Sequence, residues 1–246
     1  MISFKVNGQE LGNLMIINDV DLGFAPNINS KSKKYALMDG ERFQRRTFGK
    51  RVIKVKFTII GDRIEQTKIA IQKVLFAQEE SLFEFAHNTD IYFKGVIAGG
   101  SDYSIINWKA SEGSFEIHCY DPFAYSKKEK IAKRVSNKLV FENEGTAPVY
   151  PVYKFTAGKP YKMLSLTHPN GKAIQYGYEN GEPVINANDV VVFDSSKNEL
   201  TINGIRKYIN AASQVFAINV GTTEIAVLGD DNQIPVIEAT YRERWL

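Results

Sequence analysis

Residues 51–60 read RVIKVKFTII, and this stretch decides the class of fold. Apolar side chains recur at every second position, at Ile53, Val55, Phe57 and Ile59. The positions between them carry Lys54, Lys56 and Thr58. A period of two is that of a β-strand with one face on a core and the other in water. We therefore expect a half-buried strand here.

A helix is expected directly after this strand. Gly61 breaks the strand, and residues 62–78 then place Ile64, Ile71 and Leu75 on one helical stripe. Asp62 followed by Glu65 has the spacing of a capping box, which predicts that the helix begins there. We expect no other substantial helix.

The chain after the helix consists of short strand candidates: residues 81–86, 91–97, 103–109 and 114–120. Gly99-Gly100 and Glu112-Gly113 are the turn signals between them. None of these connections is long enough for a helical crossover, so the pairing should be antiparallel. The chain holds 15 Phe and 12 Tyr, and aromatic side chains pack well on a pleated surface.

A domain boundary is expected between residues 134 and 135, where DPFAYS at 121–126 gives way to a run of lysines and Arg134. Beyond it, turn signals recur at Pro169-Asn170-Gly171, Asn180-Gly181 and Asn203-Gly204, which is typical of an all-β sandwich. The sequence thus predicts a mainly β protein. Residues 1–134 form an N-terminal β-barrel or β-sandwich domain with one helix, and residues 135–246 form a C-terminal β-sandwich.

Residues 22–50 have little apolar periodicity and read as a long hairpin or arm that one subunit cannot bury. Residues 31–56 hold ten Lys or Arg against Asp39 and Glu41, an excess of +8. The whole chain carries +3, so the rest carries about −5. Such asymmetry indicates a docking surface for an acidic partner or a nucleic-acid patch, although a solvated arm explains it equally well.

The single cysteine, Cys119, cannot form an internal disulfide, so we expect synthesis in a reducing cytoplasm. The N-terminal sequence MISFKVNGQELG already alternates, unlike a signal peptide. No apolar run of 18 residues occurs in the sequence. We therefore expect neither secretion nor a membrane span.

No catalytic, cofactor or metal site is predicted. His87, His118 and His168 lie in separate elements without metal-ligand spacing. The sequence contains no nucleophile elbow, Walker loop or Rossmann fingerprint. Tyr161, Tyr176 and Tyr178 could stack on sugar rings, although aromatic residues in sheets more often pack across strands.

Three collinear blocks carry a family resemblance. The first is MISFKVNG, DVDLG and DGERFQRRTFGKRVIKVKFTIIG, within residues 1–61. The second is GSFEIHCYDPFAYS at 113–126, with the motif Asp121, Pro122, Phe123, Ala124 and Tyr125. The third is NEGTAPVYPVYKF at 143–155, LTINGI at 200–205 and a terminus ending in Arg242, Glu243, Arg244, Trp245 and Leu246. In order and spacing these blocks resemble the distal tail proteins of siphoviruses and related prophages.

The resemblance implies a structural virion protein of the tail tip, made in the cytoplasm of the host bacterium. The N-terminal domain would form a six-membered ring around a channel, and the C-terminal domain would be a galectin-like β-sandwich. The ring would join the tail tube to tail-associated and receptor-binding proteins of the baseplate. DNA would pass through the channel without specific binding.

Open sheet edges and an unburied arm need a neighbour, and a closed ring supplies one. The candidate assembly surface combines the basic arm with the apolar helix stripe: Arg42, Arg45, Arg46, Lys50, Arg51, Ile64, Ile71 and Leu75. The alternative is a carbohydrate-binding adhesin that contacts host cell-wall polysaccharide through the C-terminal sandwich. A cell-wall hydrolase is a third reading, for which the sequence offers no paired carboxylates or metal ligands.

Overall fold

The computed structural model describes residues 3–230 and 234–246, and they form two compact units. The first unit runs to Lys127, and the second runs from Lys128 to Trp245. The sequence predicts a boundary between residues 134 and 135, but the short strands β12 (Lys130–Ile131) and β13 (Lys133–Val135) pair with strands of the second unit. The lysine-rich stretch is therefore the beginning of the second unit.

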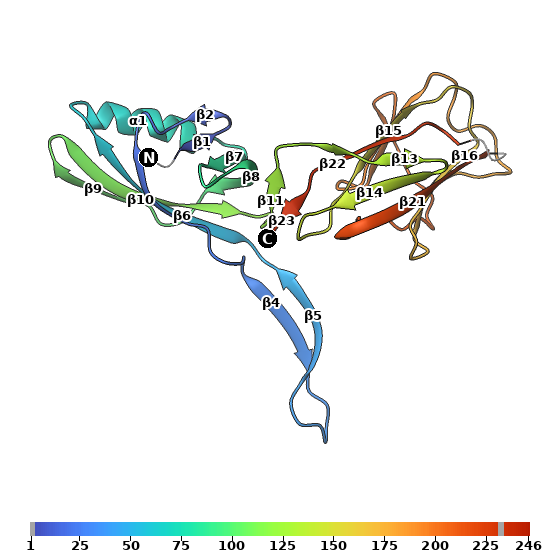
Figure 1. Cartoon of the computed structure of the whole chain (residues 1–246), viewed down its shortest axis with the longest axis horizontal. Coiled ribbons are helices and arrows are strands. Elements are labelled where there is room, and N and C mark those ends of the chain that lie inside the picture. Colours follow the sequence, from blue (N-terminus) through green and yellow to red (C-terminus); the bar gives the residue numbers. More distant parts are fainter. Residues whose placement is uncertain (1–2, 231–233) are drawn as a thin grey trace. The chain divides into compact units, whose positions relative to one another are not determined.

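The first unit is an antiparallel sheet in the order β2-β1-β7-β8-β10-β6-β3, with β9 on β10 and β11 on β8 (Figure 1). The strands are β1 (Phe4–Val6), β2 (Gln9–Glu10), β3 (Ile16–Asp21), β6 (Arg51–Ile60), β7 (Ser81–Phe85), β8 (Asn88–Ile97), β9 (Asp102–Asn107), β10 (Ala110–Cys119) and β11 (Ala124–Ser126). The rings of Phe4 on β1 and Phe115 on β10 lie 6.1 Å apart although two strands separate them in the sheet. The sheet therefore curls around a single core.

Strand β6 is the centre of this core, as its alternation predicts. It pairs with β10 over its whole length, from Ala110↔Ile60 to Cys119↔Arg51, and with β3 on its other side. Ile53 and Val55 have no exposed surface, and Ile59 has almost none. Each such side chain removed from water contributes about 1.5–3 kcal/mol. The strand prediction for residues 51–60 is confirmed.

Helix α1 (Ile64–Leu75) packs its predicted stripe on β6, so the helix and its buried face are confirmed. The predicted capping box is wrong. Arg63 occupies the N-cap position and no side chain caps the helix there. The Asp62 carboxylate is instead 3.2 Å from the Lys109 ammonium, and an ion pair to the turn between β9 and β10 competes with capping.

The predicted turn at Glu112-Gly113 is also wrong, because both residues lie inside β10. The chain reverses earlier, at Trp108-Lys109, with a register shift between Ala110 and Ser111. A Cβ atom at Gly113 would lie 2.7 Å from the Asp102 carbonyl oxygen and from the Phe57 ring. This glycine marks a close approach of chains and not a turn.

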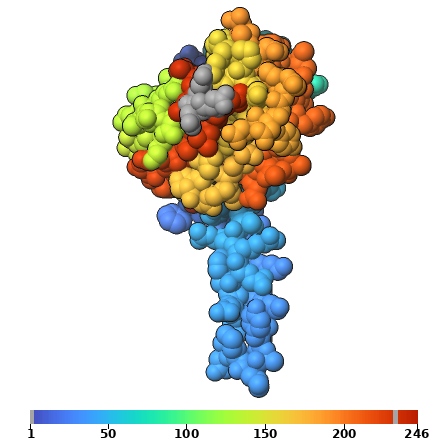
Figure 2. All heavy atoms as spheres, turned by 90° about the vertical axis from the view of Figure 1, so that its right-hand side faces the viewer, coloured from blue at the N-terminus to red at the C-terminus, as the bar shows by residue number. Residues whose placement is uncertain are grey.

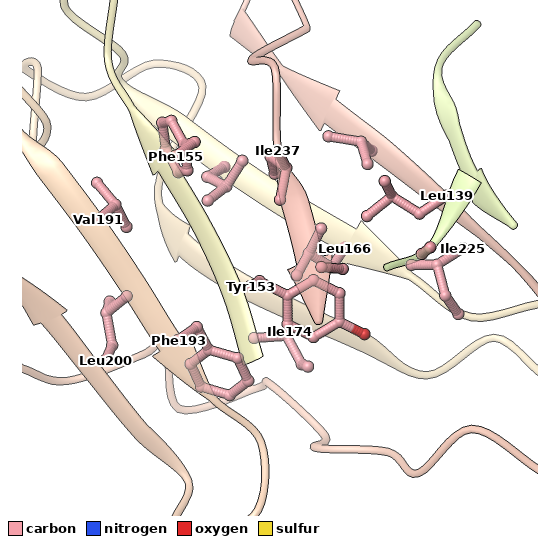
Figure 3. Packing of buried hydrophobic residues seen from close by; sticks show 14 of the residues in the cluster. Leu139, Tyr153, Phe155, Leu166, Ile174, Val191, Phe193, Leu200, Ile225 and Ile237 are labelled. Carbon is pink, nitrogen blue, oxygen red and sulfur yellow. The ribbon is translucent and has the colours of Figure 1, made fainter. Parts of the chain in front are cut away.

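The second unit is a sandwich of two sheets, in the orders β12-β22-β15-β18-β19-β20 and β13-β14-β21-β16-β17. Its further strands are β14 (Lys138–Asn143), β15 (Val152–Thr156), β16 (Met163–Thr167), β17 (Ala173–Gly177), β18 (Val190–Asp194), β19 (Glu199–Ile202), β20 (Ile205–Lys207), β21 (Gly221–Gly229) and β22 (Glu238–Tyr241). A short strand, β23 (Arg244–Trp245), follows them. Side chains of both sheets, among them Tyr153, Phe193, Leu166 and Ile225, meet in one core (Figure 3). The expected mainly β architecture is confirmed.

Two phenylalanines allow a matched test of this packing. Phe4 has no exposed surface and touches Phe83, Phe85 and Phe115, whereas Phe24 is fully exposed. We expect Phe4→Ala to lower the free energy of unfolding of the first unit by about 3–5 kcal/mol, because it leaves a cavity. Phe24→Ala should change it by less than about 0.5 kcal/mol.

Chemical unfolding followed by circular dichroism and fitted with separate transitions for the two units measures both values. Equal effects of the two substitutions would contradict this description of the core.

Candidate assembly surfaces

The arm of the first unit is a two-stranded ribbon, β4 (Ile28–Lys33) and β5 (Arg42–Phe48), which pairs with no other strand of the described chain. Its register runs from Ile28↔Phe48 to Lys33↔Arg42. Every residue of the two strands is exposed except Phe48, which is half-buried. The face of the ribbon seen in Figure 2 is uncovered along its length. A two-stranded ribbon alone is only marginally stable in water, and this arm has no core of its own.

The ribbon is strongly cationic. Lys31 lies opposite Arg45 in the register, and like charges directly opposite each other are destabilising. Within the described residues, Arg42, Arg45 and Arg46 form no ion pair, and Arg46 lies over the Phe48 ring at 5.3 Å. These three predicted residues thus have exposed charges that an acidic partner could neutralise.

Arg51 does not belong to this surface, and its assignment there is wrong. It is 3% exposed at the start of β6, with its guanidinium 5.6 Å from the centre of the Phe93 ring. Its Nε donates to the Pro122 carbonyl oxygen at 2.9 Å, and its Nη1 donates to those of Leu22 at 2.8 Å and Gly23 at 3.1 Å. Burial lowers the pKa of this guanidinium. Arg51 therefore ties both ends of the arm to the loop after β10.

The rest of the arm root is also held by side chains. Lys50 donates from Nζ to His118 Nδ1 at 3.2 Å, and His118 Nε2 lies 3.3 Å from the Glu116 carboxylate. The Phe48 ring meets the Phe123 ring edge-on at 6.0 Å. Lys50 is exposed but engaged, so it contributes to anchoring the arm more than to an open surface.

The motif Asp121–Tyr125 forms the other side of this root. Pro122 and Ala124 are buried, and the Asp121 carboxylate accepts hydrogen bonds from the Phe123 amide and the Tyr125 hydroxyl. Strand β10 ends at Cys119, and Pro122 beyond it has no backbone N–H with which to continue the pairing. The motif therefore has a structural role in fixing the arm.

The apolar helix stripe is not an assembly surface either. Ile64, Ile71 and Leu75 are 8%, 3% and 5% exposed and belong to the core of the first unit. Helical periodicity identifies the face that is buried, and here the unit's own sheet buries it. Of the large apolar side chains on or next to α1, Ile69 and Phe76 are exposed, and neither belongs to the predicted stripe.

The terminal residues 242–246 fasten the end of the chain. Glu243 is 5% exposed and accepts from the Lys130 ammonium and the Glu144 amide, both at 2.7 Å. Arg244 donates from Nη1 to the Pro148 carbonyl oxygen at 3.1 Å, and Arg242 lies 3.9 Å from Glu129. Trp245 is half-buried and Leu246 is exposed. The buried Glu243 and Arg244 hold the C-terminal strand against the sandwich.

The three tyrosines proposed to contact sugar do not form one face. Tyr161 is 6% exposed within the core, and its pKa is raised, chiefly by burial. Tyr176 packs partly buried against the same core, and only Tyr178 is well exposed, at 68%. The prediction is therefore corrected for Tyr161, whose side chain is buried in the core.

The described residues offer neither a metal site nor a reactive thiol. Among residues 3–230 and 234–246, no three His, Cys, Asp or Glu side chains are grouped so as to hold a metal ion. Burial raises the pKa of the Cys119 thiol to about 12, so this thiol is inert. No helix in the described part of the chain is long and apolar enough to cross a membrane.

Comparison with known proteins bears on both units. Residues 144–245 match the family model of the siphovirus-type tail component, C-terminal domain. The crystal structure of the Dit protein (gp 19.1) of phage SPP1 matches over 100% of both chains, with a TM-score of 0.82 and 13% identity. That protein is described as a paradigm of the hub adsorption apparatus in phages that infect Gram-positive bacteria.

A chain of the phage P2 baseplate in its activated conformation with Ca covers 99% of this chain and 98% of its own, with a TM-score of 0.53 and 9% identity. A search of curated proteins gave no match. The chain thus has the Dit fold throughout, and the resemblance to distal tail proteins is confirmed.

The role of Arg51 can be tested with Arg51→Met. We expect the free energy of unfolding to fall by about 2–4 kcal/mol, because three carbonyls lose their donor and a buried unmatched polar group costs about 1–3 kcal/mol. Amides near Leu22 and Phe48 should exchange hydrogen faster as the root loosens. The exposed Arg45→Met is the matched control and should leave stability within about 0.5 kcal/mol of the parent. Indistinguishable unfolding of the two variants would refute the tie.

Proposed function

We propose that this chain, with a siphovirus-type tail domain inside a full-length Dit fold, is a structural and non-enzymatic protein of a phage tail tip. Six copies form a ring that joins the tail tube to the tail-associated and receptor-binding proteins of the baseplate. The observation that carries the proposal is the match to SPP1 Dit over the whole of both chains. The independent family match of residues 144–245 supports it.

Open strand edges in the first unit support assembly into a closed ring. Within the described residues, β3 pairs only with β6 and β9 only with β10, so each leaves an open edge. The arm adds a ribbon that has no core of its own. Exposed edges and ribbons promote uncontrolled association, whereas a ring with rotational symmetry gives each one the same partner.

Charge supports a head-to-tail contact between copies. Residues 31–56 carry +8. The remaining residues up to Lys127 hold 13 Asp or Glu against seven Lys or Arg, which is −6. A basic arm and an acidic body on one chain are complementary between neighbours and not between identical faces. In the proposed ring each arm lies on the body of the next copy.

The same charges argue against an arm that lines the DNA channel. A lumen formed by exposed Arg42, Arg45 and Arg46 would bind phosphates and release counterions, which would retain the DNA. Covering the arm with a neighbouring protein surface removes this obstacle. The protein then acts by holding its partners in register at the virion tail tip while DNA passes through, after synthesis in the host cytoplasm.

Charge reversal in the arm tests the proposal. We expect the parent chain to form six-membered rings in native mass spectrometry, less so as salt screens the charges. The double variant Arg45→Glu, Arg46→Glu should weaken ring formation by about tenfold or more, because it removes attraction and adds repulsion. It should also reduce capture of the purified tail-tube protein.

The matched control is Arg206→Glu, Lys207→Glu, which reverses two exposed charges on β20 of the second unit. It should assemble as the parent does. The proposal fails if the arm variant forms rings and captures the tube like the parent, or if the parent remains monomeric even with tube protein present.

A further inference from the structure

A small apolar pocket reaches into the core of the first unit beside α1. It has a volume of about 90 Å³ and lies between the helix and strands β6, β9 and β10. Phe57, Ile71 and Phe115 belong to its buried lining, while Ser101 and Asp102 stand exposed at its rim. Engineered apolar cavities of ~150 Å³ remain dry and admit a benzene ring. A pocket of this smaller size suits one aliphatic side chain.

The tip of the arm presents such a side chain. Leu37 is fully exposed, and its φ of +63° lies in the left-handed region. It is the third residue of a turn closed by a hydrogen bond of 3.4 Å from the Met38 amide to the Tyr35 carbonyl oxygen. Glycine or asparagine normally occupies a turn position with positive φ. A branched apolar residue here is unfavourable in the free chain, which points to a role outside it.

Charged side chains of both signs surround the tip and the pocket. Lys33 and Arg42 flank the tip where β4 ends and β5 begins, and Asp39 and Glu41 lie within the tip itself. The pocket rim carries Asp102, on a body that is acidic as a whole, although Lys68 also lines the pocket. An apolar anchor within a polar rim is the usual anatomy of an energetic centre in an interface.

We infer that Leu37 of each copy inserts into the pocket between α1 and β9/β10 of the next copy. This inference rests on the proposed ring and names the site on the neighbour that receives the arm. Helix α1 would then contribute to assembly because it lines the pocket. Its apolar stripe remains in the core of its own unit. The occupant is a second copy of this chain.

Disulfide trapping between different chains tests the inference. Cys119 is the only cysteine of the sequence and is fully buried, so introduced thiols react without interference. One chain carries Leu37→Cys and a second, mass-tagged chain carries Ser101→Cys. After mixing under assembly conditions and mild oxidation, a disulfide between the two chains is expected, since insertion brings residue 37 to the pocket rim.

Two further variants test the insertion without a covalent trap. Leu37→Gly removes the side chain and suits the positive φ, so the monomer should be at least as stable while ring affinity falls about tenfold. Ser114→Met places a flexible apolar chain in the pocket of the receiving copy and should weaken association similarly. Val236→Ser removes an exposed apolar side chain from the second unit and should have no effect.

The outcomes separate this inference from the proposed function. Rings that form without any disulfide between residues 37 and 101, and with undiminished affinity in Leu37→Gly, overturn the pocket and leave the ring intact. Absence of rings with and without the tube protein overturns both. Disulfides only between two Leu37→Cys chains would show tips meeting tips and would also overturn the pocket.

Discussion

The guanidinium of Arg51 fixes the point at which the arm leaves the sheet, and the rest of the first unit is arranged around it. Arg51 is the first residue of the returning strand β6. Its guanidinium donates hydrogen bonds to the carbonyl oxygens of Leu22 and Gly23 on the outgoing chain, and to that of Pro122 after β10. All its hydrogen-bond acceptors are backbone carbonyl oxygens, which do not titrate. The direction in which the arm starts is therefore set by hydrogen bonds that acid does not remove. Arg51 also pairs with Cys119 at one end of the β6–β10 register.

Much of this architecture could be predicted from the sequence, and the error over Arg51 is instructive. Arg51 lies two and four residues before Ile53 and Val55, and side chains two residues apart in a strand share one face. The alternation that identifies the strand therefore also places Arg51 on the buried face. Its charge instead favours a surface position, which is correct for most arginines. The assignment of the helix stripe to an assembly surface is wrong for a similar reason, because a periodic apolar face belongs first to the core of its own unit.

Other features depend on contacts that no local pattern contains. Gly113 looks like a turn residue, and only the approach of Phe57 and the Asp102 carbonyl explains it within a strand. The burial of Tyr161 depends on Ile185, which lies opposite it in an isolated bridge. The pocket beside α1 depends on how the helix crosses β9 and β10, and the φ of Leu37 depends on the turn at the arm tip. Each of these is a tertiary fact about residues distant in sequence or a backbone angle unusual for its residue type.

The arm is a hairpin of β4 and β5 that extends from the antiparallel pair of β3 and β6. Strands β3 and β6 are already antiparallel partners, and Asn27, Gly49 and Lys50 continue their pairing through backbone hydrogen bonds into β4 and β5. The segments that enter and leave the arm at its root are thus neighbours, whatever the length of the ribbon between them. Residues could be added to or deleted from the ribbon in opposed pairs without disturbing the sheet. Arm length is consequently a dimension that evolution or a protein engineer can adjust separately from the fold.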